Sequence, residues 1–190
     1  MATPLLAGAA ARRRPPARTL RLFIALWPDA ATQERLHAEA ARFAALGRRL
    51  PARNLHVTLA FLGSVAPART EEIVRVMHEA RPQACELVLD RLAYFARSGI
   101  LGAACASVPA GLAGYHQRLS AALAAAGLRV EKRALHPHIT LLRDAARPAP
   151  QQLTLAPPLT LAVREIVLVR SVLSPGGSRY EVISRVAAPG

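Results

Sequence analysis

Asn54-Leu55-His56-Val57-Thr58-Leu59-Ala60-Phe61-Leu62-Gly63 is the stretch of sequence that decides the fold of this chain. It alternates between polar and apolar residues and then becomes apolar, which predicts a β-strand that runs as far as Leu62. Successive side chains of a strand point to opposite faces, so we expect His56 and Thr58 to share one face while their apolar neighbours point into the core. Phe61 and Leu62 are expected to fill that core.

A second stretch repeats this pattern in the other half of the chain. It reads Pro137-His138-Ile139-Thr140-Leu141-Leu142-Arg143 and predicts a short strand over Ile139–Leu142. His138 and Thr140 again share one face, and Arg143 follows just past the strand. Two such strands side by side would line a polar cleft with two imidazoles and two hydroxyls.

This set of side chains suits a phosphodiester substrate. Hydrolysis needs one group that takes a proton from water and another that protonates the departing oxygen. Imidazole serves both roles because its pKa lies near neutrality. Threonine hydroxyls can donate to the non-bridging phosphate oxygens, where charge grows in the transition state, and Arg143 can add a bidentate clamp. No cysteine or carboxylate lies at ligand spacing near either motif, so we expect no metal.

The rest of the chain predicts a mixed α and β fold with both hairpins and crossovers. We expect a flexible N-terminal extension over residues 1–18 and a single domain over residues 19–190. The first helix should be capped by Asp29 and end at Gly47. The expected apolar helix faces are Leu36, Ala40, Phe43 and Ala44, then Ile73, Val76, Met77 and Ala80, then Leu112, Tyr115, Leu119 and Leu123. Further strands are expected over Leu20–Leu26, Glu86–Phe95 and Leu101–Val108. Leu159–Leu173 holds a long β-rich run, and Arg179–Val186 is expected to pair with it across Pro175-Gly176-Gly177.

Composition narrows the class of partner. The 190 residues carry a formal net charge of +13, which indicates an anionic partner, nucleic acid first and an anionic membrane surface second. All basic residues except Lys132 are arginine, so biased genome composition explains the charge equally well. No apolar run approaches the roughly 20 residues of a membrane span, and no membrane partner is expected. Cys85 and Cys105 share no motif, which favours free thiols in a reducing cytoplasm.

Both motifs resemble the two signatures of the LigT-like two-histidine phosphoesterases. The opening Arg21-Leu22-Phe23-Ile24-Ala25-Leu26 is also similar to theirs, as is Ser171 followed by Gly177 and Tyr180. The resemblance extends over about residues 19–186 and is strongest to the bacterial RNA 2′,3′-cyclic phosphodiesterases, which are also named for a 2′-5′ RNA ligase activity. One histidine–threonine pair would be weak support, but two copies with these flanks are specific.

The resemblance implies a bilobal α+β fold with two antiparallel sheets and flanking helices, related by a pseudo-twofold axis around a central cleft. It implies a hydrolase that needs no metal, and we expect a cytoplasmic monomer without a cofactor. The substrate would be RNA with a 2′,3′-cyclic phosphate end, tRNA fragments included, and the product a 2′-phosphomonoester, with reversible 2′-5′ ligation as the reverse reaction. His56 and His138 would be catalytic, while Thr58, Thr140 and Arg143 would bind the substrate.

Four points stay open here. Family members often have an aromatic residue where this chain has Leu135, so the nucleobase can be held differently here. The family pattern favours His138 as the base and His56 as the acid, but the symmetry of the motifs leaves that assignment open. The same residues would also serve a phosphodiesterase for another cyclic or 2′-5′ nucleotide, and the same scaffold could belong to a non-catalytic protein that binds RNA or nucleotides.

Overall fold

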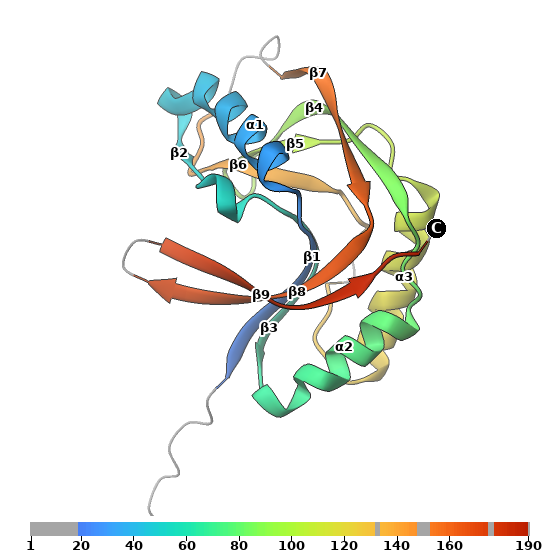
Figure 1. Cartoon of the computed structure of the whole chain (residues 1–190). Coiled ribbons are helices and arrows are strands. Elements are labelled where there is room, and N and C mark those ends of the chain that lie inside the picture. Colours follow the sequence, from blue (N-terminus) through green and yellow to red (C-terminus); the bar gives the residue numbers. More distant parts are fainter. Residues whose placement is uncertain (1–18, 132–133, 148–152, 175–176, 190) are drawn as a thin grey trace, which may run out of the picture.

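A computed structural model describes residues 19–131, 134–147, 153–174 and 177–189. The expected N-terminal extension, residues 1–18, lies outside these ranges, as do Pro175 and Gly176 of the expected turn. Within them, nine strands form one antiparallel sheet in the order β7-β4-β5-β6-β3-β1-β8-β9, with β2 paired to β6 (Figure 1). The strands are β1 (Leu20–Leu26), β2 (Arg48–Arg49), β3 (Val57–Val65), β4 (Cys85–Phe95), β5 (Ile100–Ala104), β6 (His138–Arg143), β7 (Thr154–Val163), β8 (Glu165–Ser174) and β9 (Gly177–Ala187).

The two halves of this sheet are joined in the middle by very little strand pairing. Strands β3 and β6 are joined at a single pair of residues, Val57 and Ile139, which belong to the two repeated motifs. The predicted α+β class with antiparallel strands is confirmed. The two separate sheets implied by the resemblance are not seen as such, because this one pair connects β7-β4-β5-β6 to β3-β1-β8-β9.

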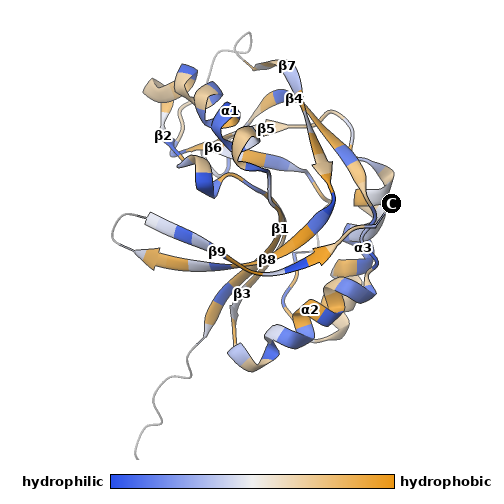
Figure 2. Ribbon diagram, viewed as in Figure 1, coloured by the Kyte–Doolittle hydropathy of each residue, from blue (hydrophilic) through white to orange (hydrophobic). Residues whose placement is uncertain are grey.

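Helices cover one face of the sheet and form the main core with it. They are α1 (Ala30–Ala40), α2 (Thr70–Glu79) and α3 (Ala110–Ala125), with short 3-10 helices η1 (Ala41–Leu46), η2 (Ala52–Asn54) and η3 (Pro67–Arg69). Their predicted apolar faces, Ala44 excepted, are buried against strand residues such as Leu22, Ile24 and Leu168. In Figure 2 the apolar positions of α2 and α3 recur along each helix, as expected for helices that pack on one side.

A second, smaller apolar cluster lies on the other face of the sheet. Phe23 and Ala25 of β1 pack there with Val167 and Val169 of β8, and no helix residue belongs to the cluster. Alternation explains the separation, because the neighbours of these residues along each strand point into the main core. This uncovered face carries the candidate site.

The end of the first helix differs from the prediction. Asp29 accepts a hydrogen bond from the backbone N–H of Thr32 at 2.7 Å, so the predicted cap is confirmed. The α-helix ends at Ala40, and the chain continues as a 3-10 helix with fewer residues per turn, which leaves Ala44 exposed. Gly47 does end this segment, but a Cβ there would lie 2.8 Å from the carbonyl oxygen of Arg143, so close approach to β6 explains the glycine.

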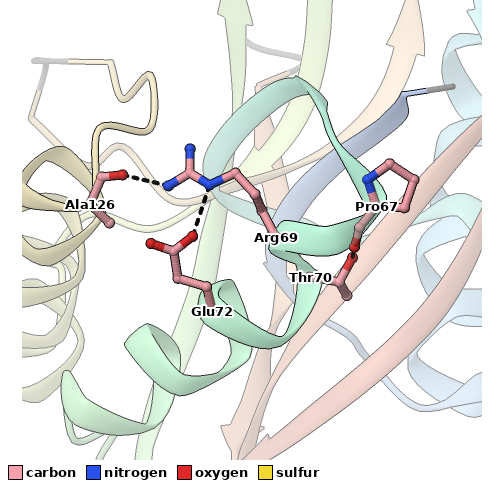
Figure 3. Close-up of polar contacts among 5 residues, drawn as sticks. All are labelled: Pro67, Arg69, Thr70, Glu72 and Ala126. Carbon is pink, nitrogen blue, oxygen red and sulfur yellow. Dashed lines mark hydrogen bonds and ion pairs between the residues drawn. The ribbon is translucent and has the colours of Figure 1, made fainter. Parts of the chain in front are cut away.

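Polar contacts tie α2 to α3 at the edge of the fold (Figure 3). The Arg69 guanidinium donates from Nε to Glu72 at 2.8 Å and from Nη2 to the carbonyl oxygen of Ala126, at the end of α3. Thr70 donates its hydroxyl to the Pro67 carbonyl at 2.8 Å. The bond from Arg69 to Ala126 therefore joins the start of α2 to the end of α3.

Candidate active site

One cavity of about 340 Å³ contains all five site residues predicted from the sequence. His56 and Thr58 reach it from β3 and the residue before it, while His138, Thr140 and Arg143 reach it from β6. Val57 and Ile139, which alternate with these residues, are fully buried on the opposite face. The pairing of Val57 with Ile139 in antiparallel strands puts His56 on the side of Thr140 and His138 on the side of Thr58.

A β-bulge follows each histidine–threonine pair. The register of β1 against β3 skips Leu59, and the register of β5 against β6 skips Leu141. A bulge inserts one extra residue and reverses the alternation beyond it. This explains why Arg143, five positions after His138, lies on the same face as that histidine and lines the cavity.

The same reversal corrects the prediction for Phe61. Its side chain was expected in the core, but it is 48% exposed and lines the cavity. The bulge at Leu59 turns it onto the cleft face, opposite Phe23 of β1. Leu62 is buried as predicted. Phe61 thus occupies on β3 the position that Arg143 occupies on β6.

Hydrogen bonds define the tautomer of His56. Its Nδ1 lies 2.6 Å from the carbonyl oxygen of Asn54, an acceptor that requires Nδ1 to carry the proton. In the neutral ring, Nε2 is then unprotonated, and the Thr58 hydroxyl lies 3.1 Å from it and can donate to it. The reactive nitrogen of His56 therefore shares the cavity with the neighbouring hydroxyl.

Three aromatic rings surround the imidazole of His56. The Trp27 ring stacks on it with centroids 5.5 Å apart and an interplanar angle of 9°. Phe23 lies at 4.8 Å and is tilted, and Tyr180 of β9 presents an edge at 5.1 Å. These rings come from β1 and its end and from the β8–β9 hairpin, and they restrict the imidazole to one orientation.

Burial makes His56 a neutral residue in the free protein. Removal from water lowers the pKa of its imidazole from the ordinary 6.5 to about 4, although the hydrogen bond to Asn54 acts in the opposite direction. The positive charges of Arg143 and of protonated His138 contribute to this lowering of the pKa, by smaller amounts than burial. Charged residues of the second motif therefore act electrostatically on the histidine of the first motif.

His138 is held in a similar way from the other side of the cavity. Its Nδ1 lies 2.8 Å from the carbonyl oxygen of His136, which again directs Nε2 away from the backbone. Phe95 of β4 contacts the ring at a centroid distance of 4.5 Å. Arg143, beyond it on β6, is paired in register with Arg48 of β2, whose ion pair with Asp144 at 3.4 Å is largely exposed.

Comparison with known proteins identifies the family. A sequence profile described as the 2′-5′ RNA ligase superfamily matches residues 27–174. The chain belongs to the 2′-5′ RNA ligase superfamily. Among relatives of this superfamily, the RNA 2′,3′-cyclic phosphodiesterase of Escherichia coli strain K12 is 34% identical over 172 residues, which cover 88% of this chain and 96% of that protein.

Solved structures of superfamily members agree with this assignment. The apo form of E. coli LigT superposes with a TM-score of 0.81 at 31% identity and covers 89% of this chain and 97% of its own. E. coli LigT complexed with 3′-AMP gives a TM-score of 0.79 at 31% identity, covering 90% and 98%. The resemblance described from the two motifs is therefore confirmed at the level of the family.

Several residues in the cavity or against the His56 ring had no role assigned to them from the sequence. Tyr180 and Phe23 belonged to the resemblance without a role, and Trp27 had no signal beyond its apolar character. Leu135 and His116 also line the cavity. Burial lowers the pKa of His116, which lies near the Leu59 carbonyl at the first bulge.

Three further observations concern metal binding, cysteine reactivity and membrane spans in the described residues. No group of three or more histidine, cysteine, aspartate or glutamate side chains in the described ranges is arranged to hold a metal ion. Burial raises the pKa of both Cys85 and Cys105, which lowers the fraction of reactive thiolate. No helix in the described part of the chain is long and apolar enough to cross a membrane.

Proposed function

We propose that this protein hydrolyses 2′,3′-cyclic phosphodiester ends of RNA to 2′-phosphomonoesters, without a metal ion. The observation that carries the proposal is the convergence of two imidazoles, two threonine hydroxyls and one guanidinium on a single cavity. The name of the E. coli relative, RNA 2′,3′-cyclic phosphodiesterase, supports the choice of substrate. The net charge of +13 also suits an RNA partner.

The cyclic phosphate would lie between the two motifs. Thr58 and Thr140 donate to its non-bridging oxygens, and Arg143 adds a bidentate pair of hydrogen bonds. These donors contribute most where negative charge accumulates, on the oxygens of the pentacoordinate phosphorus. His56 and His138, on opposite sides of the phosphate, then face the attacking water and the departing 3′ oxygen.

Proton transfer needs one imidazole of each form. We propose the assignment that the family resemblance favours, with His138 as the base that takes a proton from water. His56 then protonates the 3′ oxygen as the P–O3′ bond breaks, which leaves the phosphate on the 2′ oxygen. Because the free protein keeps His56 neutral, this role requires the negative charge of the bound phosphate to raise its pKa. Ligation of 2′-5′ ends would be the reverse reaction through the same site.

We further propose a single bilobal domain over residues 19–190, with a pseudo-twofold axis through the Val57–Ile139 pair. The matched positions of the two bulges, each one residue after a threonine, support this symmetry. Under this symmetry Phe61 and Arg143 occupy equivalent positions, each five residues after the histidine of its motif. One motif therefore has an aromatic ring where the other has a guanidinium. Phe61 is then available to stack on the nucleobase, which suits a site where Leu135 has no aromatic ring.

Incubation with a 2′,3′-cyclic nucleotide, followed by chromatography of the products, tests the proposal. The expected product is the nucleoside 2′-monophosphate. Binding without turnover would instead favour a non-catalytic nucleotide-binding protein. A preference for 2′-5′ oligonucleotides over the cyclic ester would reassign the substrate while keeping the same residues.

A further inference from the structure

Two buried polar side chains hold the segment of chain that carries His56. Among the described residues, Gln33 and Asn54 are the buried polar side chains of the protein interior, each 7% exposed. They come from different elements, α1 and η2. Gln33 donates a hydrogen bond to the segment just before β3, and Asn54 donates one from that segment to another part of the chain.

Gln33 anchors this segment to α1. Its Nε2 donates to the carbonyl oxygen of Leu55 at 3.0 Å. Leu55 is 1% exposed, so water cannot replace Gln33 at that carbonyl. The hydrogen bond fixes the peptide plane that joins Leu55 to His56.

Asn54 anchors the same segment to the β8–β9 hairpin. Its Nδ2 donates to the carbonyl oxygen of Ser178 at 2.9 Å, two residues before Tyr180, whose ring edge contacts the imidazole of His56. The carbonyl oxygen of Asn54 also accepts the hydrogen bond from Nδ1 of His56. The plane of that carbonyl is fixed in turn by the hydrogen bond from the backbone N–H of Leu55 to Ala52.

We propose that Gln33 and Asn54 are positioning residues for the His56 imidazole: the Gln33 side chain fixes the peptide plane directly before His56, and the Asn54 side chain fixes the hairpin beside it. His138 has a different support, because the carbonyl that holds it belongs to the exposed His136. The catalytic consequence of this inference depends on the proposed function, but the geometric consequence does not.

Two variants remove the donors with little change of shape. Gln33→Met replaces the amide by an apolar chain of similar length, and Asn54→Asp replaces the donating amide by a carboxylate that accepts only. We expect each to lower kcat on the cyclic substrate by about 10- to 100-fold through misorientation of His56, with KM changed less than threefold. Leu36→Ala, one turn along α1 and fully buried, is the matched control. It should lower the melting temperature while keeping kcat within about twofold, well under 1 kcal/mol.

A double-mutant cycle separates positioning from general destabilisation. In a His56→Ala background, Gln33→Met and Asn54→Asp should change kcat less than about twofold, because the group that they orient is absent. An equal loss in both backgrounds, or parent-like kcat in both single variants, would overturn the proposal.

Nitrogen NMR of the histidine ring supplies a measurement that does not need activity. The parent protein should show His56 protonated at Nδ1 and not at Nε2 near neutral pH, and Asn54→Asp should shift its resonances and its titration midpoint. The opposite tautomer in the parent, or unchanged resonances in Asn54→Asp, would refute the proposal even if Gln33→Met failed to fold. An inactive parent with the expected ring resonances would refute the proposed function alone.

Discussion

Binding of a nucleoside 2′-monophosphate is expected to raise the pKa of His56 from about 4 towards its ordinary value of 6.5. The reason is that the negative charge of the bound phosphate attracts the imidazolium and offsets the effect of burial, which disfavours the charged form. In the proposed reaction His56 protonates the departing oxygen, so the protonated form must be accessible once the phosphate is bound.

The size of the expected change follows from the structure. The difference between 6.5 and about 4 corresponds to about 3.4 kcal/mol against the charged form. One negative charge about 5 Å from the imidazolium, at an effective dielectric constant of about 20, stabilises it by about 3.3 kcal/mol. The anion is therefore expected to offset most of the effect of burial.

Proton NMR titration of the histidine Cε1–H resonances measures both states, and the His56→Gln variant assigns the signal among the six histidines. Arg143→Gln in the free protein is the matched control, because the loss of a positive charge that lowers this pKa should raise it. A midpoint that stays near 4 in the complex would refute the acid role of His56 and exchange the roles of the two histidines. A midpoint near 6.5 in the free protein would refute the argument from burial.

Three further predictions concern the cavity. Arg143→Lys keeps the positive charge but loses the bidentate geometry of the guanidinium, so it should lower kcat/KM in steady-state kinetics. Arg143→Ala should cost about 2–4 kcal/mol of transition-state stabilisation. If Arg143→Ala changes kcat/KM by less than about twofold, Arg143 is only a surface residue. Phe61→Ala should raise KM by about tenfold or more, because the loss of stacking on the base costs about 1–3 kcal/mol, whereas Phe61→Tyr should leave KM unchanged. Equal KM values for Phe61→Ala and the parent protein would exclude a contact between Phe61 and the base. His56→Ala and His138→Ala should each lower kcat by about 10² or more, and the double variant should lose much less than the product of the two; multiplicative losses would show independent roles.

The sequence predicted those features that depend on local patterns. An apolar run located β1 over Leu20–Leu26, and helical periodicity located the interior positions of α2 and α3. The duplicated motif anticipated one cavity for both histidines; His138 begins β6 as predicted, and His56 directly precedes β3. The helix cap at Asp29 was also predictable, because a cap depends only on residues that are neighbours in the sequence.

The bulges at Leu59 and Leu141 were not predictable, because both positions read as ordinary apolar strand residues. Their effect is large, since each reverses the alternation beyond it. This is why Phe61 was wrongly assigned to the core and why Arg143 shares a face with His138 despite an odd spacing.

The environment of His56 depended on contacts between segments distant in sequence. Tyr180 reaches it from β9, and Gln33 and Asn54 hold it from α1 and η2. Polar residues buried far from one another along the chain show no periodic signal, so only the folded arrangement reveals that they meet. The lowered pKa of His56 has the same origin, because burial is a tertiary property.

The most direct test of the central claim is phosphorus NMR of an RNA oligonucleotide with a 2′,3′-cyclic phosphate end, incubated with the protein in excess chelator. The cyclic resonance should be replaced by that of a 2′-phosphomonoester at an undiminished rate, and His138→Ala should slow the replacement by about 10² or more. A 3′-phosphomonoester product, a rate that chelation abolishes and a divalent ion restores, or parent-like turnover by His138→Ala would each contradict a metal-independent reaction carried by the two histidines.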